Sequence, residues 1–88
     1  MSDLSGEDAR GLAALGAAIR TLRIQAGLGE DEMAERAHLP QAFLAAIEAG
    51  QKEPTWGDLR RIARGLGTPL ESLLELAESL EGAGSEPS

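Results

Sequence analysis

The chain has 88 residues and a formal net charge of −7, with no cysteine, no tyrosine, one phenylalanine and one tryptophan. A chain of this length forms one small domain, and without cysteine it has neither disulfides nor thiolate metal sites. The single His38 cannot hold a metal unaided, no apolar run reaches the roughly 20 residues that span a bilayer, and the N-terminus is acidic rather than a basic signal region. We expect a cytoplasmic protein with no metal, no cofactor and no membrane contact.

Alanine, leucine, glutamate and arginine dominate the composition and valine is absent, which favours helix over sheet. Residues 1–11 and 77–88 carry −5 of the net charge, so the middle of the chain carries only −2. Nucleic-acid binders usually present a basic surface. The acidity therefore counts against nucleic-acid binding, and the nearly neutral middle weakens that objection.

The first helix is predicted to begin after Ser5, its cap, and to end at Gly27, with residues 1–4 frayed. Gly11 and Gly16 each weaken this helix by up to about 1 kcal/mol relative to alanine. Each either marks a close helix crossing or has no structural role, and we prefer the second interpretation. The apolar stripe recurs at spacings of three and four residues: Leu12, Leu15, Ile19, Leu22.

Residues 28–54 predict two short helices joined by a tight turn. The first begins near Glu30, and the second runs to about Ala49 with Pro40 in its first turn. His38 is the expected turn residue of positive φ. Two helices that cross steeply across such a turn form a helix-turn-helix. Small and apolar residues mark their inward sides: Met33, Ala34, Ala37, Leu44, Ala45, Ile47.

Thr55 is predicted to cap a fourth helix together with Asp58, and residues 68–71 to begin a fifth. Residues 82–88 have nothing to bury and are expected to form a disordered tail. The single domain therefore spans residues 5–81. The fourth helix buries one apolar face (Leu59, Ile62, Ala63, Leu66), and so does the fifth (Leu70, Leu73, Leu74, Ala77, Leu80).

Four segments carry motifs at fixed spacing: LGAAIRTLRIQAGL at 15–28, EDEMAERAHLP at 30–40, FLAAIEAGQKEPT at 43–55 and LRRIARGLGTPLESLL at 59–74. Together they resemble the Cro/repressor-type helix-turn-helix family, the XRE class, over about residues 12–77. The resemblance implies an all-α fold, a compact five-helix bundle like that of lambda repressor. It also implies that the third helix enters the major groove of duplex DNA, that dimers bind palindromic sites, and that Arg23 pairs with Glu48 to hold the first and third helices together.

The resemblance also places the residues that would meet DNA. Only Gln41 can make a bidentate contact to adenine, whereas Ala42 and Ala46 can contact thymine methyl groups. Phe43 can either make such a contact too or pack against a partner. Gln51 and Lys52, after the third helix, would hold phosphates. The outward positions of the third helix that would meet bases are Gln41, Ala42, Phe43 and Ala46.

Three positions depart from the family pattern. Glu30 stands where the family often has a glutamine that touches the DNA backbone, and a carboxylate beside a phosphate is repelled. His38 replaces the turn glycine, and Pro40 replaces the usual polar cap of the third helix. Positive charge near the expected interface is limited to Lys52, with Arg36 and the pair at 60–61 as further candidates, which implies few phosphate contacts.

Two functions remain open. The first is a sequence-specific transcriptional regulator that binds duplex DNA as a homodimer on a palindromic operator, with backbone N–H groups at Trp56 and Gly57 available to a further phosphate. The second is a protein-interaction module with weak or lost DNA binding, because the smooth third helix and the acidic turn at 30–32 would suit a basic or apolar protein partner. An enzyme is not expected, since the sequence has no nucleophile–base pair, glycine-rich phosphate loop or metal cluster.

Trp56 is unusually large for its position after a loop. It either fills the core or lies at a subunit contact, and we prefer the first interpretation. Leu76 and Leu80 flank the buried stripe of the fifth helix and are candidates for a two-fold interface.

Overall fold

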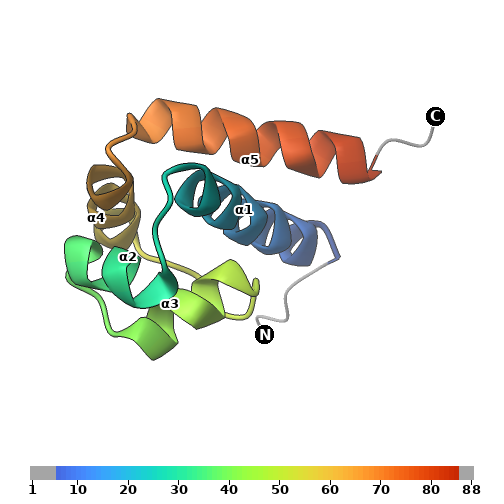
Figure 1. The fold of residues 1–88 in the computed structure, drawn as a ribbon. Coiled ribbons are helices and arrows are strands. Elements are labelled where there is room, and N and C mark those ends of the chain that lie inside the picture. Colours follow the sequence, from blue (N-terminus) through green and yellow to red (C-terminus); the bar gives the residue numbers. More distant parts are fainter. Residues whose placement is uncertain (1–5, 86–88) are drawn as a thin grey trace.

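The computed structural model describes the backbone of residues 6–85 and the side-chain environment of residues 9–82. All regular structure in this range is helical, which confirms the predicted all-α fold. No helix in the described part of the chain is long and apolar enough to cross a membrane. The elements in chain order are α1 (Gly6–Gln25), α2 (Glu30–Ala37), α3 (Gln41–Glu48), α4 (Trp56–Leu66) and α5 (Leu70–Ser85) (Figure 1).

The predicted boundaries differ most at the C-terminus. α5 continues to Ser85, so residues 82–85, which we expected in a disordered tail, are helical. Our prediction rested on the lack of apolar residues to bury after residue 81. A helix that already exists gains one backbone hydrogen bond for each residue added, so it can be extended without burying new apolar surface. The predicted frayed residues 1–4, the cap at Ser5 and residues 86–88 lie outside the described residues.

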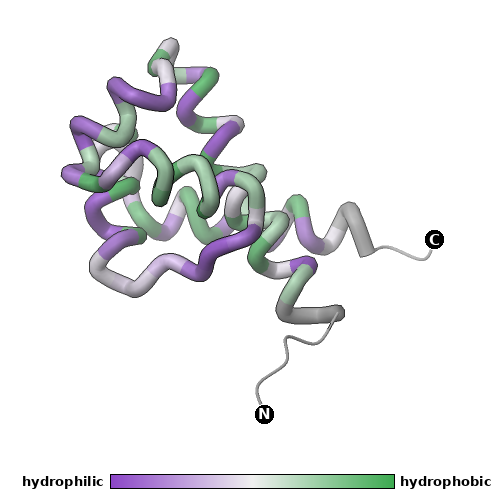
Figure 2. Tube along the Cα trace, turned by 90° about the horizontal axis from the view of Figure 1, so that it is seen from below, coloured by the Kyte–Doolittle hydropathy of each residue, from purple (hydrophilic) through white to green (hydrophobic). Residues whose placement is uncertain are grey.

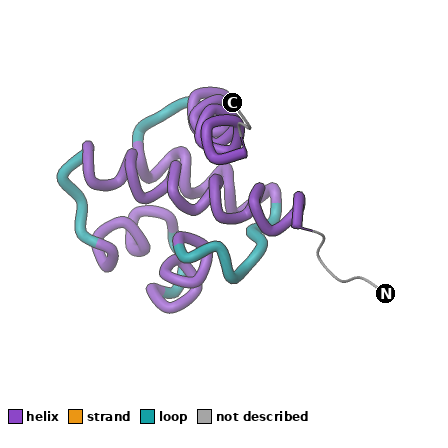
Figure 3. The backbone as a smooth tube through the Cα atoms, turned by 90° about the vertical axis from the view of Figure 1, so that its right-hand side faces the viewer, coloured by secondary structure: helices purple, strands orange, loops and turns teal. Residues whose placement is uncertain are grey.

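α1 is the central element of the bundle. α5 lies across one side of it, and α2, α3 and α4 lie on the other side (Figure 1). Figure 3 shows α5 nearly end-on above α1, which runs across the view, so these two helices cross steeply. α2 packs against both α3 and α4. The helix-turn-helix pair is therefore held from above by α1 and from the side by α4.

The core takes side chains from all five helices. Hydrophobic residues alternate with polar ones along the helices (Figure 2). Hydrophobic side chains of every helix are buried or packed against the core. Burial of each large apolar side chain stabilises the fold by about 1.5–3 kcal/mol relative to exposure. The predicted inward positions of α2 and α4 are buried, as expected. The largest fully buried side chains are Ile19, Met33, Leu44, Ile47, Ile62 and Leu73.

The start of α4 is fixed by a capping box, as predicted. The Thr55 Oγ1 atom accepts a hydrogen bond from the Asp58 N–H at 3.0 Å, and the Asp58 Oδ2 atom accepts one from the Thr55 N–H at 2.9 Å. Arg61 also donates a hydrogen bond to the Asp58 Oδ1 atom, at 3.2 Å. These bonds satisfy donors that a helix N-terminus would otherwise leave unpaired, so the first turn of α4 has a defined position.

Gly16 marks a close crossing of α1 over the end of α3, and our preferred interpretation of this glycine is wrong. A Cβ atom at this position would overlap the carbonyl oxygens of Ile47 and Glu48 and would lie 2.8 Å from the Glu48 carbonyl carbon. These are backbone atoms of a packed helix, which cannot move aside as a flexible side chain can. At Gly11 a Cβ atom would meet only the carboxylate of Glu81, at 3.8 and 3.9 Å.

Arg23 and Glu48 join α1 to the same end of α3. The Arg23 Nε atom donates a hydrogen bond to Glu48 Oε2 at 2.8 Å, and Nη2 donates to Oε1 at 3.1 Å. The exposed fractions of the two side chains are 10% and 5%. The hydrogen bonds that Arg23 donates to Glu48 raise the pKa of Arg23 against the lowering effect of burial, so the arginine remains charged. Arg23 also donates to the Leu28 carbonyl oxygen at 2.9 Å, which fixes the chain between α1 and α2.

We predict that Gly16→Ala destabilises the protein by about 1–3 kcal/mol, because the new methyl group overlaps the backbone of α3. Gly11→Ala is the matched control, since the same change there meets no backbone and should stabilise α1 by up to about 1 kcal/mol. The free energy of unfolding in urea checks both values. Equal effects of the two substitutions would show that the crossing at Gly16 does not restrict this position.

We predict that Arg23→Ala costs about 3–5 kcal/mol, because it leaves a nearly buried carboxylate and the Leu28 carbonyl oxygen without their donor. Glu48→Ala should cost less, since Arg23 keeps its bond to Leu28 and has Glu30 within 3.8 Å. Urea unfolding of both variants measures the difference. A larger loss of stability in Glu48→Ala than in Arg23→Ala would contradict this, because it would show that the contacts of Arg23 with Leu28 and Glu30 do not compensate for the loss of Glu48.

Candidate nucleic-acid interface

The exposed side of α3 is the candidate interface. Gln41 and Ala42 in the first turn are exposed, and Ala46 one turn later is half-buried. Phe43 corrects our prediction of a simple outward position, because it is half-buried and packs against the hydrophobic core. Residues four apart share a helix face, so Phe43 is placed beside the fully buried Ile47. The open surface of α3 is therefore concentrated in its first turn.

The turn before α3 sets the direction of that surface. His38 has φ 57° and ψ 44°, the left-handed conformation predicted for it. Its N–H donates to the Glu35 carbonyl oxygen at 3.2 Å, and the Leu39 N–H donates to that of Ala34 at 2.9 Å. Pro40 is the N-cap rather than the first helical residue and offers no side-chain hydrogen bond. As a result, the first amides of α3 are not capped by a side chain.

The segment after α3 carries the remaining predicted contacts. Gln51 and Lys52 are both exposed, and the Gln51 N–H donates to the Ala46 carbonyl oxygen at 2.9 Å. Gly50 has φ 74°, and a Cβ atom there would lie 3.0 Å from Ala13 Cα in α1. The polar residues of this segment therefore lie on a turn whose backbone is held against the bundle.

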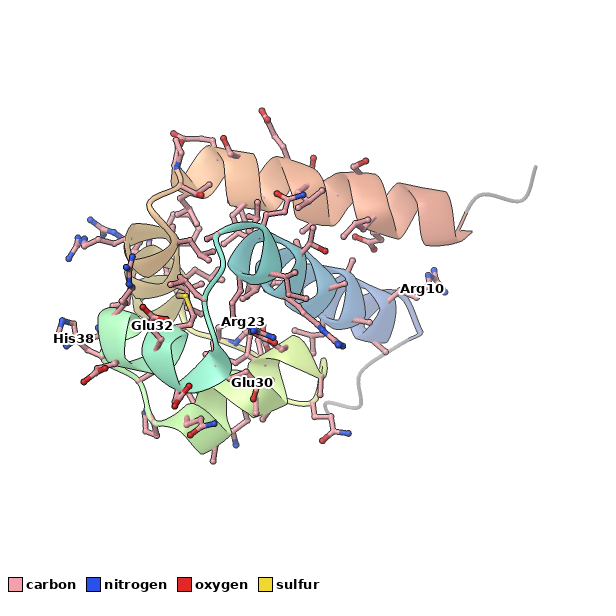
Figure 4. The ribbon with its side chains drawn as sticks, in the orientation of Figure 1. Arg10, Arg23, Glu30, Glu32 and His38 are labelled. Carbon is pink, nitrogen blue, oxygen red and sulfur yellow. The ribbon has the colours of Figure 1, made fainter. Side chains whose placement is uncertain are left out.

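Charge around the interface is of mixed sign. Glu30 begins α2, its side chain is 41% exposed, and its Oε2 atom lies 3.8 Å from the Arg23 Nη2 atom. The arginine that binds Glu48 thus also offsets part of the charge at Glu30. Sequence patterns do not predict this contact, because the two residues belong to different helices and no local spacing relates them (Figure 4).

The basic residues of α2 and α4 differ in whether their side chains are free to bind a phosphate. Arg36 is directed towards α4, where its Nη1 atom donates to the Gly65 carbonyl oxygen at 3.4 Å. Its Nη2 atom lies 4.0 Å from Glu32. Arg61 binds Asp58, a contact that the spacing of three residues along one helix could have indicated. Arg60 is exposed. Of the four basic residues that the sequence suggested near the interface, Lys52 and Arg60 are therefore the two whose side chains are free to bind a phosphate.

Trp56 overturns the preferred interpretation that it fills the core. Its side chain is 60% exposed, among the most exposed large hydrophobic residues of the described chain. Trp56 is the first residue of α4, directly after the capping residue, and the buried side of that helix is occupied by Leu59, Ile62 and Leu66. At the first position of α4 Trp56 lies three residues before Leu59 and so borders this buried face, yet its own side chain remains mostly exposed.

Comparison with known proteins gives the chain its relatives. A model of the helix-turn-helix domain family matches residues 14–76. The chain is 28% identical to ClgR, a clp gene regulator from Corynebacterium glutamicum, over 88% of this chain and 80% of that one, with a TM-score of 0.81. A second ClgR structure from this organism gives 31% identity over 81% and 90% of the two chains, with a TM-score of 0.74.

A third structural relative shares the fold at lower identity. It is the restriction-modification controller protein C.AhdI from Aeromonas hydrophila, which is 24% identical over 70% of this chain and 94% of that one, with a TM-score of 0.69. The search of curated protein sequences found no match. The family match covers the turn at His38, the crossing at Gly16 and the pair between Arg23 and Glu48. The chain belongs to the Cro/repressor-type (XRE) helix-turn-helix family.

Proposed function

We propose that this protein is a sequence-specific, DNA-binding transcriptional regulator that acts as a homodimer on a palindromic operator. The observation that carries the proposal is the exposed first turn of α3, where Gln41 and Ala42 are open to solvent on a helix whose C-terminal end is bonded to α1. Membership of the family supports it, as does the similarity to a protein named as a clp gene regulator. Fold alone would not suffice, because function depends on the residues of the site.

The proposed contacts follow from the chemistry of the exposed side chains. Gln41 has both the donor and the acceptor that read adenine in the major groove, and the Ala42 methyl group suits a thymine methyl. Ala46 can make a similar apolar contact from the next turn. Gln51 and Lys52 hold phosphates at the end of the recognition unit. With one helix reading few bases, a second copy on the other half-site would double the sequence that is read.

The dimer would use the side of α5 that Leu76 and Leu80 border. Both residues are half-buried in the single chain, so each retains apolar surface that a partner can cover. Leu80 also lines a mostly apolar groove between α1 and α5, together with Ala13 and Ala17. Apolar area of this kind supports association in proportion to the area removed from water.

One observation favours the second function, a protein-interaction module. The outer face of α2 is acidic, with Asp31, Glu32 and Glu35 all exposed beside the candidate interface. Against it, the half-burial of Phe43 leaves less smooth apolar surface on α3 than this function needs. We therefore place DNA binding first.

Selection of bound fragments from a random duplex pool, at two salt concentrations, tests the choice. An enriched palindromic motif would support both the regulator and the dimer. A motif without two-fold symmetry would support DNA binding and count against the dimer. No enrichment, even at low salt where phosphate contacts are strongest, would reject the proposal in favour of a protein partner.

We predict that Gln41→Ala lowers affinity for the selected operator by about tenfold or more and relaxes the preference at one base pair, because a good bidentate contact discriminates by about 1–3 kcal/mol. Lys52→Ala should weaken binding to all DNA sequences alike and reduce the steepness of the plot of log affinity against log salt concentration (the salt slope) by about 0.9. Gln25→Ala, also an exposed glutamine but at the end of α1, is the matched control. Fluorescence anisotropy of labelled duplex measures all three, and unchanged affinity in Gln41→Ala would reject its assigned role.

We predict that Glu30→Gln tightens DNA binding several-fold at low salt, because it removes a half-exposed carboxylate from the expected path of the DNA backbone. The gain should shrink as salt screens the charge. Glu71→Gln makes the same change of charge on the exposed side of α5. If both variants tighten binding equally, only the net charge matters and Glu30 does not face the DNA.

A further inference from the structure

The outer face of α4 combines the exposed tryptophan with arginines. Trp56, Arg60 and Arg64 are spaced four residues apart, and residues at this spacing lie on one side of a helix. All three are exposed. The helix rises about 1.5 Å per residue, so successive members of this stripe are about 6 Å apart along the axis. An aromatic ring and two guanidinium groups thus form a line that starts at the N-terminus of α4.

The positive charge of this stripe is not neutralised within the protein. Asp58, the one acidic residue of α4, is 8% exposed and is engaged by Thr55 and Arg61. The side chains of Arg60, Arg64 and Lys52 form no hydrogen bond or ion pair with another described residue. The exposed acid Glu53 lies in the preceding loop. In a chain of net charge −7, this face is consequently a local exception.

The stripe fits a sugar–phosphate strand better than a protein partner. Among the residues next to Trp56 in sequence or one turn along α4, Thr55, Gly57 and Arg60 are polar or small and Leu59 is buried, so Trp56 is the one exposed large apolar side chain of this turn. Stable protein interfaces need a larger contiguous core. A ring bordered by cations instead suits nucleic acid, because the guanidinium binds a phosphate and the ring packs on the apolar face of the adjoining sugar or base.

The position of the stripe relative to α3 also favours a sugar–phosphate strand as the partner. α3 has 8 residues and is therefore about 12 Å long. When its first turn reads bases, the chain that leaves its C-terminus lies within about 12 Å of them, and the phosphate strands border the same groove. The following loop is held by the Gln51 N–H bond and by the buried Pro54, so it leads directly to Trp56.

We infer that Trp56 and Arg60 form a second DNA contact, in which the indole ring packs on a deoxyribose and the guanidinium binds the adjoining phosphate of the strand that borders the groove occupied by α3. The inference rests on the proposed function and deepens it, since it assigns α4 a backbone-binding role. Arg64 extends the same positive line away from the groove. This contact adds a cation for phosphate binding where α3 and the loop after it offer one, Lys52.

Trp56 is the sole tryptophan of a chain without tyrosine, so its fluorescence reports on this position alone. The experiment measures quenching by acrylamide, a neutral quencher that DNA does not repel, in the intact protein with and without duplex. Binding of the duplex is followed in parallel by anisotropy of a label on the DNA. Because backbone contacts are independent of sequence, a random duplex at low salt suffices. We expect the quenching constant to fall several-fold as the duplex saturates the protein.

Variants separate the two members of the contact. Trp56→Ala should weaken duplex binding by about tenfold with little change in salt slope, since it removes stacking and no charge. Arg60→Ala should reduce the slope by about 0.9. Arg10→Ala is the matched control, because it removes the same charge at the opposite end of the molecule (Figure 4). All three residues are exposed, so the variants should fold as the parent does.

Each outcome has a distinct meaning. Duplex binding with unchanged acrylamide quenching would overturn the inference and leave the proposed function standing. Emission that changes with protein concentration in the absence of DNA would also overturn it, since a second copy would then cover Trp56. Equal salt slopes for Arg60→Ala and Arg10→Ala would reject the role of Arg60. No duplex binding by the parent at low salt would reject the proposed function, and the inference with it.

Discussion

The junction between α1 and the C-terminal end of α3 is the constraint on which the remaining structure depends. The bidentate pair of Arg23 and Glu48 and the close approach at Gly16 act on the same turn of α3, one by charge and one by the absence of a side chain. α3 has only 8 residues and no side-chain cap at its start, and a helix of this length is marginal in isolation. Its exposed first turn is therefore oriented mainly from its far end.

Sequence patterns predicted the parts of the fold that local rules govern. The capping box at Thr55, the left-handed turn at His38 and the apolar stripes each follow from residues within one or two helical turns of one another. Gly16 and Trp56 were misjudged for a common reason. Whether a glycine is crowded or a tryptophan exposed depends on which helix passes beside it, and such information is not local. The length of α5 was also underestimated, because helix extension does not require burial.

The candidate site was predictable to a similar degree. The family resemblance placed three polar residues at the interface, which requires them to be exposed. The structure shows that all three are: Gln41, Gln51 and Lys52. Phe43 differs, since helical spacing relates it to the core through Ile47 as well as to the outward positions. The contact of Glu30 with Arg23 adds a point that neither pattern nor resemblance contained. The carboxylate that we predict to oppose DNA is at the same time in contact with the junction that positions α3.

The unequal distribution of charge has a consequence for how this molecule meets a polyanion. α4 presents unpaired arginines, whereas α5 presents Glu71, Glu75 and Glu78, all exposed. At ionic strengths where the Debye length is about 10 Å, DNA responds to the nearest charged face rather than to the total of −7. In the proposed DNA-binding mode, approaches that lead with α5 are repelled and those that lead with α4 are attracted. The charge distribution then selects the orientation of the encounter, so a net negative charge does not by itself prevent this protein from engaging DNA.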